Sequence, residues 1–247
     1  MIPIRDNRPT RHKPVVTWTL IALNVLVFLI EWSAGDAGME AIVRRFGVVP
    51  SVLVEGQWSL PRAAGGAQGA WVTPLTSLFL HGGWLHLIGN MWFLHIFGDN
   101  VEDELGKARY LALYFAAGFA AVFAQAAVDP SSAVPMVGAS GAISGVLAAY
   151  VLIHPRARIL TLVPIFIFIQ FIELPAFLFI FIWFGFQLLE GALSLRQSAG
   201  AGGVAFFAHV GGFMSGLLIG WIFVASLRKR RAHFIRRQAW PPDLPLR

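Results

Sequence analysis

The sequence has no cysteine, little charge and no His-Glu-x-x-His motif. Lys, Arg, Asp and Glu make up 13% of its 247 residues, whereas a soluble domain carries about 25%. The absence of cysteine excludes a disulfide framework and a cysteine nucleophile. Because ionised groups are costly in hydrocarbon, this scarcity of charge, together with 57% hydrophobic residues, predicts an integral membrane protein.

Long apolar runs recur along the chain. A helix that crosses the hydrocarbon core needs about 20 such residues. Runs of about this length lie at residues 15–32, 84–101, 108–128 and 204–227. A shorter run at 140–153 is confined between Pro135 and Pro155. At 1.5 Å per residue it is roughly 20 Å long, so we expect its Ser140 end to lie inside the bilayer.

The stretch 159–195 is too long for one span, and it contains Pro164, Pro175 and Glu173. The loop at 154–158 and the C-terminal tail are both basic, and basic loops remain on the cytoplasmic side. An even number of crossings therefore separates them. We place one span at 174–195 and interpret 159–173 as a dipping or interfacial segment, without a function for Glu173. The predicted fold is an all-α, polytopic bundle of six transmembrane helices.

This topology divides the chain into a basic cytoplasmic N-terminus (1–14), a six-span domain (15–227) and a basic cytoplasmic tail (228–247). A long loop at about 33–83, with short interfacial helices, lies on the non-cytoplasmic side. The tail adjoins a span, which favours an anchor that meets anionic lipid over a nucleic-acid site, so no nucleic acid is expected. The first apolar run is too long for a secretory signal. Together with the Ala-, Gly- and Arg-rich composition, this favours a prokaryotic plasma membrane.

Ser140 stands at the start of the short helix, in the sequence Gly138-Ala139-Ser140-Gly141. Free backbone N–H groups and the helix dipole favour a developing negative charge at this point. Flanking glycines let another chain approach the backbone closely, so we assign Gly138 and Gly141 a supporting structural role. Gly141-xxx-Gly145 is also typical of simple helix packing in membranes. This motif alone leaves both interpretations open.

His209 lies within the last apolar run. An ionisable residue inside a span is a functional candidate by default, and a hydrogen-bonded packing histidine is the alternative. Gly212, Gly216 and Gly220 follow at intervals of four and line one helix face. We therefore expect this helix to press against the glycine-lined 140–153 helix, with Gly212 and Gly216 as structural support.

His86 and Asn90 are four residues apart and share a helix face. Both side chains donate hydrogen bonds, as a developing oxyanion requires. His81 lies about 140° from His86 around a helix and is interpreted as structural.

A metal site would need more ligands than His81, His86 and His95 offer. An aspartyl mechanism would need two intramembrane carboxylates that share a proton. Asp99 lies near a span end, no second span contains an aspartate, and Glu31 and Glu173 lie near predicted interfaces, so neither a metal site nor an aspartyl site is expected.

Together these segments resemble the rhomboid family of intramembrane proteases. The stretch TSLFLHGGWLHLIGN at 76–90, continued by FGDNVED at 97–103, is similar to the family's second-span signature. Gly138-Ala139-Ser140-Gly141 is similar to its nucleophile motif, and Ala208-His209-xx-Gly212 to its sixth-span histidine motif. The matching segments run from about Trp71 to Gly220 in the family's order.

The resemblance implies a six-helix fold with an aqueous cavity open to the non-cytoplasmic side. It implies that Ser140 is the nucleophile and His209 the general base, without a third acid. His86, Asn90 and the Ser140 backbone N–H would form the oxyanion hole. Substrates would be single-span membrane proteins, cut within or beside their transmembrane segment, and no cofactor is implied.

Two positions depart from the pattern of some family members. Ser144 stands where those members have a tyrosine that stacks on the catalytic histidine, which leaves open how the His209 ring is held. Trp71 is followed by Val72 in place of arginine.

The alternative to a protease is a catalytically silent rhomboid-like protein that binds client transmembrane helices. Such a protein would lose Ser140 or His209 first. A small-solute transporter would need repeated halves, and no repeat is visible.

Overall fold

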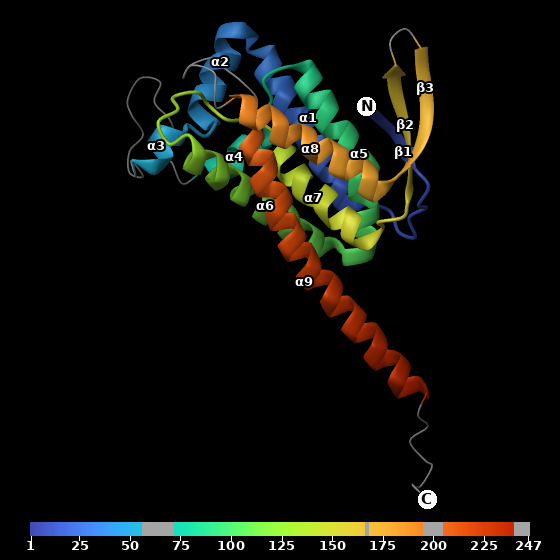
Figure 1. Ribbon diagram of the computed structural model, residues 1–247. Coiled ribbons are helices and arrows are strands. Elements are labelled where there is room, and N and C mark those ends of the chain that lie inside the picture. The colour runs from blue at the N-terminus through green and yellow to red at the C-terminus, as the bar shows by residue number, and fades with distance from the viewer. Residues whose placement is uncertain (56–71, 166–167, 195–204, 240–247) are drawn as a thin grey trace, which may run out of the picture.

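The computed structural model describes residues 1–55, 72–165, 168–194 and 205–239. Within them, helices form a bundle with a small sheet at one edge, and the last helix projects beyond the bundle (Figure 1). The long helices are α1 (Val15–Ser33), α5 (Trp84–Leu105), α6 (Lys107–Val128), α7 (Ser140–Ile153), α8 (Ala176–Ser194) and α9 (Phe206–Ala239).

Three helices in the described ranges are long and apolar enough to cross a membrane: α1, α6 and the Phe206–Leu227 part of α9. The apolar helices Ser140–Ile153 and Ala176–Leu189 are shorter. α5 has 22 residues but ends in an acidic run. The protein is therefore mostly helical and membrane-embedded. That its chain crosses the membrane six times stays a prediction.

Helix α7 lies at the centre of the bundle. It packs against α5, α6 and α9, and every residue from Gly141 to Val151 is buried. It begins after Gly138, whose φ of 123° is a conformation that favours glycine, and it ends before Pro155. Its 14 residues span about 21 Å, which agrees with the short helix that the sequence predicts.

Helices α7 and α9 meet backbone to backbone. A Cβ atom added at Gly212 would lie 2.0 Å from the carbonyl oxygen of Gly141. One added at Gly216 would lie 2.4 Å from the Cα of Gly145. The two glycine faces therefore contact each other, and this contact brings the start of α7 beside the start of α9.

The predicted loop with short helices contains α2 (Gly35–Phe46), α3 (Pro50–Val54), α4 (Thr73–Thr76) and the 3₁₀ turn η1 (Ser77–Phe79). Residues 56–71, with Trp71, lie outside the described part. Backbone bonds tie this region to the chain before α7: Val48 N–H donates to the Met136 carbonyl at 3.0 Å, and the reverse bond measures 2.7 Å. The loop is thus fixed close to the segment that leads into Ser140.

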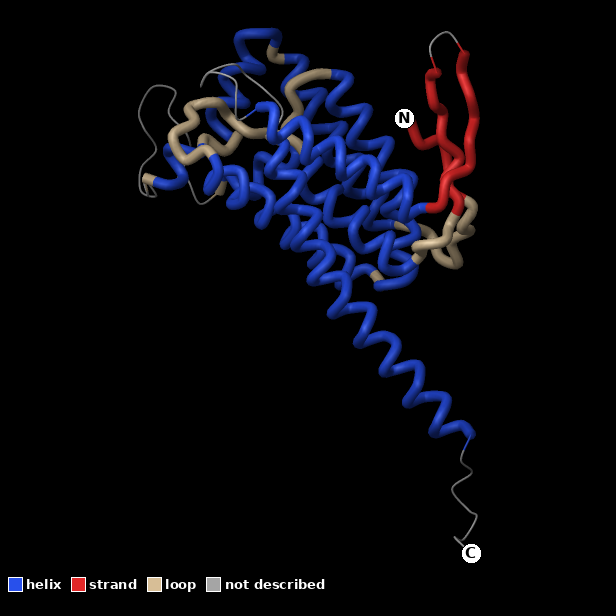
Figure 2. The backbone as a smooth tube through the Cα atoms, in the orientation of Figure 1, coloured by secondary structure: helices blue, strands red, loops and turns tan. Residues whose placement is uncertain are grey.

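The all-α prediction is wrong in one region, because residues 159–165 and 168–173 lie in strands. β1 (Ile2–Asp6), β2 (Arg158–Ile165) and β3 (Phe168–Pro175) make an antiparallel sheet in the order β1-β2-β3 (Figure 2). β-branched and aromatic residues make up half of β2 and β3, which favours strands. Pro164 is tolerated because β1 pairs no further along β2 than Leu162, so no neighbour there needs its missing N–H.

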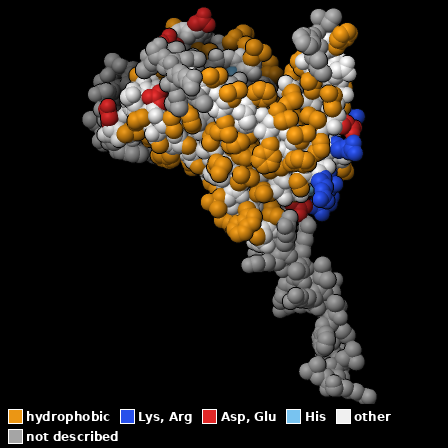
Figure 3. Space-filling model, in the orientation of Figure 1, with side chains coloured by type: hydrophobic (Ala, Val, Ile, Leu, Met, Phe, Trp, Pro, Cys, Tyr) orange, Lys and Arg blue, Asp and Glu red, His pale blue; other side chains and the backbone are white. Residues whose placement is uncertain are grey.

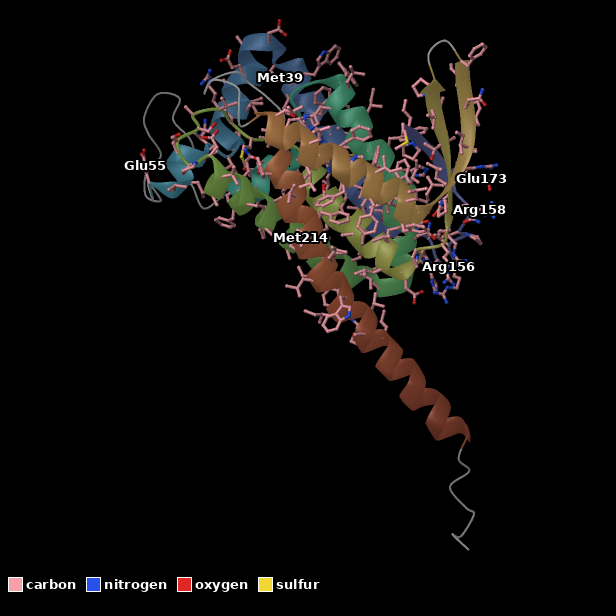
Figure 4. The ribbon with its side chains drawn as sticks, viewed as in Figure 1. Met39, Glu55, Arg156, Arg158, Glu173 and Met214 are labelled. Atoms are coloured by element: carbon pink, nitrogen blue, oxygen red, sulfur yellow. The ribbon has the colours of Figure 1, made fainter. Side chains whose placement is uncertain are left out.

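Side-chain contacts hold the sheet. Arg158 Nη1 lies 3.2 Å from Glu173 Oε2, on the neighbouring strand, and Figure 4 shows this pair beside Arg156 at the base of the sheet. The pair gives Glu173 a structural role. β1 is held to α5, because Trp92 Nε1 donates to the Pro3 carbonyl at 2.6 Å.

Hydrophobic side chains cover most of the visible face of the bundle, and Lys and Arg gather at the end near the base of the sheet (Figure 3). Large apolar side chains are exposed on several long helices, among them Leu26, Phe123, Leu188, Leu218 and Trp221. Apolar patches of this extent fit contact with lipid rather than water.

Candidate active site

The structure brings Ser140 and His209 together. Ser140 is the first residue of α7 and His209 lies in the first turn of α9. The His209 Nε2 atom lies 2.8 Å from the Ser140 Oγ atom. The histidine is 8% exposed and the serine is half-buried. The two residues are therefore in direct hydrogen-bond contact at one end of the α7–α9 interface.

The second ring nitrogen of His209 has a partner that the sequence motifs do not identify. His209 Nδ1 forms a hydrogen bond with Gln187 Oε1 of α8. The Trp183 and Phe206 rings have centroids 6.1 and 6.5 Å from the imidazole centroid. The available signal in the sequence was that Gln187 is one of the few polar residues in a mostly apolar helix.

Ser144 does not hold the imidazole. Its hydroxyl donates to the backbone carbonyl of Ser140 at 2.7 Å, and its side chain is fully buried. Apart from Ser140, the described side chains that contact the His209 ring belong to α8 and to Phe206.

His86 and Asn90 both lie beside Gly138, two residues before Ser140. A Cβ atom added at Gly138 would lie 2.7 Å from the His86 Nε2 atom and 3.5 Å from the Asn90 Nδ2 atom. Only glycine fits at this position, both because of this contact and because of its positive φ. The shared helix face predicted for His86 and Asn90 thus faces the segment that leads into Ser140.

The two side chains differ in exposure. His86 is exposed, whereas Asn90 is 8% exposed and its Nδ2 is a buried donor for which the described residues supply no hydrogen-bond partner. A buried polar group normally has a partner, and leaving it unpaired is costly. Within the described part of the chain, the Asn90 amide is thus a free donor beside Gly138.

His81 is buried next to the His86 ring. Its ring centroid lies 5.1 Å from that of His86, and its backbone N–H donates to the Glu31 Oε2 atom of α1 at 3.2 Å. The described residues contain no group of three or more His, Asp or Glu side chains arranged to hold a metal ion.

Gly141 completes the close packing around Ser140. A Cβ atom added there would lie 2.4 Å from the Ala121 Cβ atom of α6. With Gly138, Gly212 and Gly216, it is one of four glycines at which a larger side chain would disturb the backbone around the Ser140–His209 pair.

Comparison with known proteins gives a consistent result. The family model described as the Rhomboid domain matches residues 68–226. The rhomboid protease GluP of Bacillus subtilis is 36% identical over 151 residues, which cover 60% of this chain and 27% of that protein. Rhomboid-like protein 11, chloroplastic, of Arabidopsis thaliana is 30% identical over 164 residues, covering 62% and 52%. The chain thus spans about half of these relatives' length or less.

Proposed function

Since the chain belongs to the rhomboid family, we propose that it is an intramembrane serine endopeptidase that cleaves single-span membrane proteins within or next to their transmembrane segment. The observation that carries this proposal is the 2.8 Å contact between Ser140 Oγ and His209 Nε2. A serine hydroxyl is a poor nucleophile unless a base adjoins it. The relatives named as proteases support the same activity.

The reaction follows from this contact. Ser140 Oγ attacks the carbonyl carbon of the scissile peptide while His209 Nε2 accepts the hydroxyl proton. The tetrahedral intermediate collapses, the C–N bond breaks, and the imidazolium returns the proton to the leaving amine. Water, deprotonated by the same nitrogen, then hydrolyses the acyl-enzyme and frees Ser140.

The negative charge that develops on the substrate carbonyl oxygen needs donors that are already in place. The unpartnered Asn90 Nδ2 and the neighbouring His86 ring support an assignment of both residues to the oxyanion hole. Backbone N–H groups at the start of α7 supply further donors, because the first turn of a helix leaves them free. The exposure of His86 favours access of the water that hydrolysis consumes.

We also propose six crossings with both termini in the cytoplasm, in a prokaryotic plasma membrane. Arg156 and Arg158 lie at one end of the molecule, and Glu55 and Met39 at the other (Figure 4). Basic residues favour the cytoplasmic side, so the Ser140 end faces away from it. In this proposal the chain has a basic cytoplasmic N-terminus (1–14), a six-span domain (15–227) and a basic cytoplasmic tail (228–247). Anionic lipid is the proposed partner of the tail.

Cleavage of a single-span substrate in reconstituted liposomes tests this proposal. The wild type should cut the substrate, Ser140→Ala should not, and a fluorophosphonate probe should label Ser140 alone. Ser215→Ala is a matched control, because Ser215 lies in the same bundle and its hydroxyl donates to the Gly212 carbonyl; it should cleave normally. Binding of the substrate without cleavage by the wild type would favour a catalytically silent client-binding protein instead.

A further inference from the structure

The partner of His209 Nδ1 is the Gln187 Oε1 atom of α8. We propose that Gln187 is the positioning residue of the site, which selects the tautomer of His209 and holds its ring toward Ser140. This inference rests on the proposed function for its catalytic consequence, while the hydrogen bond itself is independent of any activity.

The tautomer follows from the chemistry of the amide. A carbonyl oxygen accepts hydrogen bonds and cannot donate them. With Gln187 Oε1 against Nδ1, the neutral ring carries its proton on Nδ1. Nε2 is then unprotonated and free to accept the Ser140 hydroxyl proton across 2.8 Å. The opposite tautomer would leave Ser140 without a base.

A second contact comes from the same face of α8. Trp183 precedes Gln187 by four residues, a spacing that puts both on one side of a helix. The Trp183 ring lies beside the imidazole at an interplanar angle of 41°. One helix face thus supplies both a ring contact and a hydrogen-bond acceptor, which answers how the ring is held when Ser144 replaces a stacking tyrosine.

An uncharged acceptor suits this buried position. In serine proteases a carboxylate usually orients the histidine, but a buried carboxylate is costly when its partner is neutral. In the part of the chain that the structure describes, His86 of α5 is the titratable side chain close enough to influence His209. The contacts from α7 and α8 are the neutral Ser140 and Gln187. Gln187 therefore orients the ring without adding a buried charge.

NMR of the wild-type protein with isotope-labelled histidine tests the tautomer directly. We expect a proton on His209 Nδ1 and none on Nε2, with the signals assigned by their loss in His209→Asn. A proton on Nε2 would overturn the proposal. The tautomer is read from the wild-type protein, the variant serves only to assign the signals, and the measurement needs no turnover. If the wild type neither cleaves nor labels, the proposed function fails, and the NMR result still decides the role of Gln187.

Variants of Gln187 test the consequence for catalysis. Gln187→Met keeps the length of the side chain but removes the hydrogen-bond acceptor. It should lower kcat about five- to tenfold, which corresponds to the net contribution of one hydrogen bond, and should change KM little. Gln187→Glu keeps an acceptor and should restore most of the turnover. It should also move the acidic limb of the pH–rate profile to higher pH, because a nearby carboxylate favours the protonated imidazole.

Gln125→Met is the matched control. Gln125 Oε1 accepts from the Ala208 backbone N–H at 3.3 Å, so this variant loses a hydrogen bond to the same helix without touching the imidazole. It should leave the pH–rate profile and the His209 tautomer as in the wild type. Wild-type kcat in Gln187→Met, or equal pH shifts in the Gln125 and Gln187 variants, would refute a positioning role.

Discussion

At the scale of single residues, the site contains a buried polar group for which the described residues supply no partner. This group is the Asn90 Nδ2 donor, which is buried without a hydrogen bond to them. An unpaired buried donor costs about 1–3 kcal/mol, so such groups are rare unless a function retains them. Asn90 adjoins the segment that leads into Ser140, and a substrate oxyanion would supply the missing acceptor.

Replacement of Asn90 by alanine should therefore separate catalysis from stability. We expect Asn90→Ala to lower kcat by about 10²–10³-fold, the usual cost of one oxyanion donor. The melting temperature should not fall through the loss of a hydrogen bond, because no described residue accepts from this donor in the free protein. Steady-state cleavage in detergent and thermal unfolding measure the two effects.

Asn24→Ala is the matched control for this prediction. Asn24 is also a buried asparagine, but its Nδ2 donates to the Leu20 carbonyl at 2.7 Å. Its loss should reduce stability and leave kcat unchanged. Equal turnover of Asn90→Ala and the wild type would show that Asn90 is only a packing residue.

At the scale of elements, the sequence predicts the helices better than the sheet. The hydropathy of α1, α6 and α9 and the prolines around α7 mark these helices directly. The β2–β3 hairpin was missed because a continuous apolar run has no period that distinguishes a strand from a buried helix. Gln187 was missed for a related reason, since its role depends on which face of α8 meets α9, and no local motif encodes that contact.

The acidic run at the end of α5 caps another helix. Glu102 accepts the backbone N–H groups of Val16 and Thr17 at 3.0 and 2.8 Å, at the start of α1, where no side chain of the adjoining residue caps the helix. Glu102→Ala should destabilise the protein by about 1–3 kcal/mol, because it leaves buried donors unpaired. Thermal unfolding measures this loss. Glu40→Ala, which removes an exposed partner of Arg44, should cost under about 1 kcal/mol, and an equal cost for both would contradict the capping role.

The neighbouring Asp103, beyond the predicted span, should make the fold sensitive to acid. Burial raises its pKa, but hydrogen bonds from His12 and Arg11 outweigh this and lower it to about 2. A depressed pKa means that the folded state stabilises the ionised form. This stability is present above the unfolded value of about 4 and is lost as the pH falls toward 2.

Unfolding measured across this pH window tests the contribution of Asp103. Asp103→Asn should show a smaller loss of stability than the wild type between about pH 4 and pH 2. The effect should be modest, since the Arg11 and His12 side chains are largely exposed. Parallel pH curves for the two proteins would exclude this contribution.

The glycine contact between α7 and α9 should control activity. In Gly212→Ala the new Cβ would lie 2.0 Å from the Gly141 carbonyl oxygen, so the helices must separate and the Ser140–His209 contact must lengthen. We expect fluorophosphonate labelling to be lost. Gly185→Ala is the control, because no atom of the described residues lies within 4 Å of a Cβ at that position, and it should label normally. Full labelling of Gly212→Ala would contradict the assigned role of this contact.

At the scale of the whole molecule, the distribution of basic residues predicts how the protein is oriented in the membrane. The structure identifies the exposed positions at which this orientation can be tested. Arg156 is exposed at the basic end, and Asp36 is exposed on α2. Ala157, next to Arg156, is 6% exposed and would be unreactive on either side of a membrane. A probe of topology must therefore use Arg156 rather than its neighbour.

Single cysteines in this cysteine-free chain should report its orientation. In intact cells, a membrane-impermeant thiol reagent should label Asp36→Cys and should not label Arg156→Cys. After permeabilisation both should react, which controls for access. Labelling of Arg156→Cys from outside intact cells would exclude the proposed six-span arrangement.

The glycine contacts between α7 and α9 have a consequence for helix register. Gly141 meets Gly212, Gly145 meets Gly216, and Ala149 meets Gly220, so both helices repeat the contact every fourth residue. Sliding by part of a turn is blocked by backbone collision. Sliding by about one turn, near 5.4 Å, would offer most of the small residues new partners of the same kind but would part Ser140 from His209. The repeat therefore limits the protein to discrete alignments of the two helices, and only one of these is competent for catalysis. The choice among them must come from unrepeated features at the helix ends, such as the Gly138 turn and the Gln187–His209 bond.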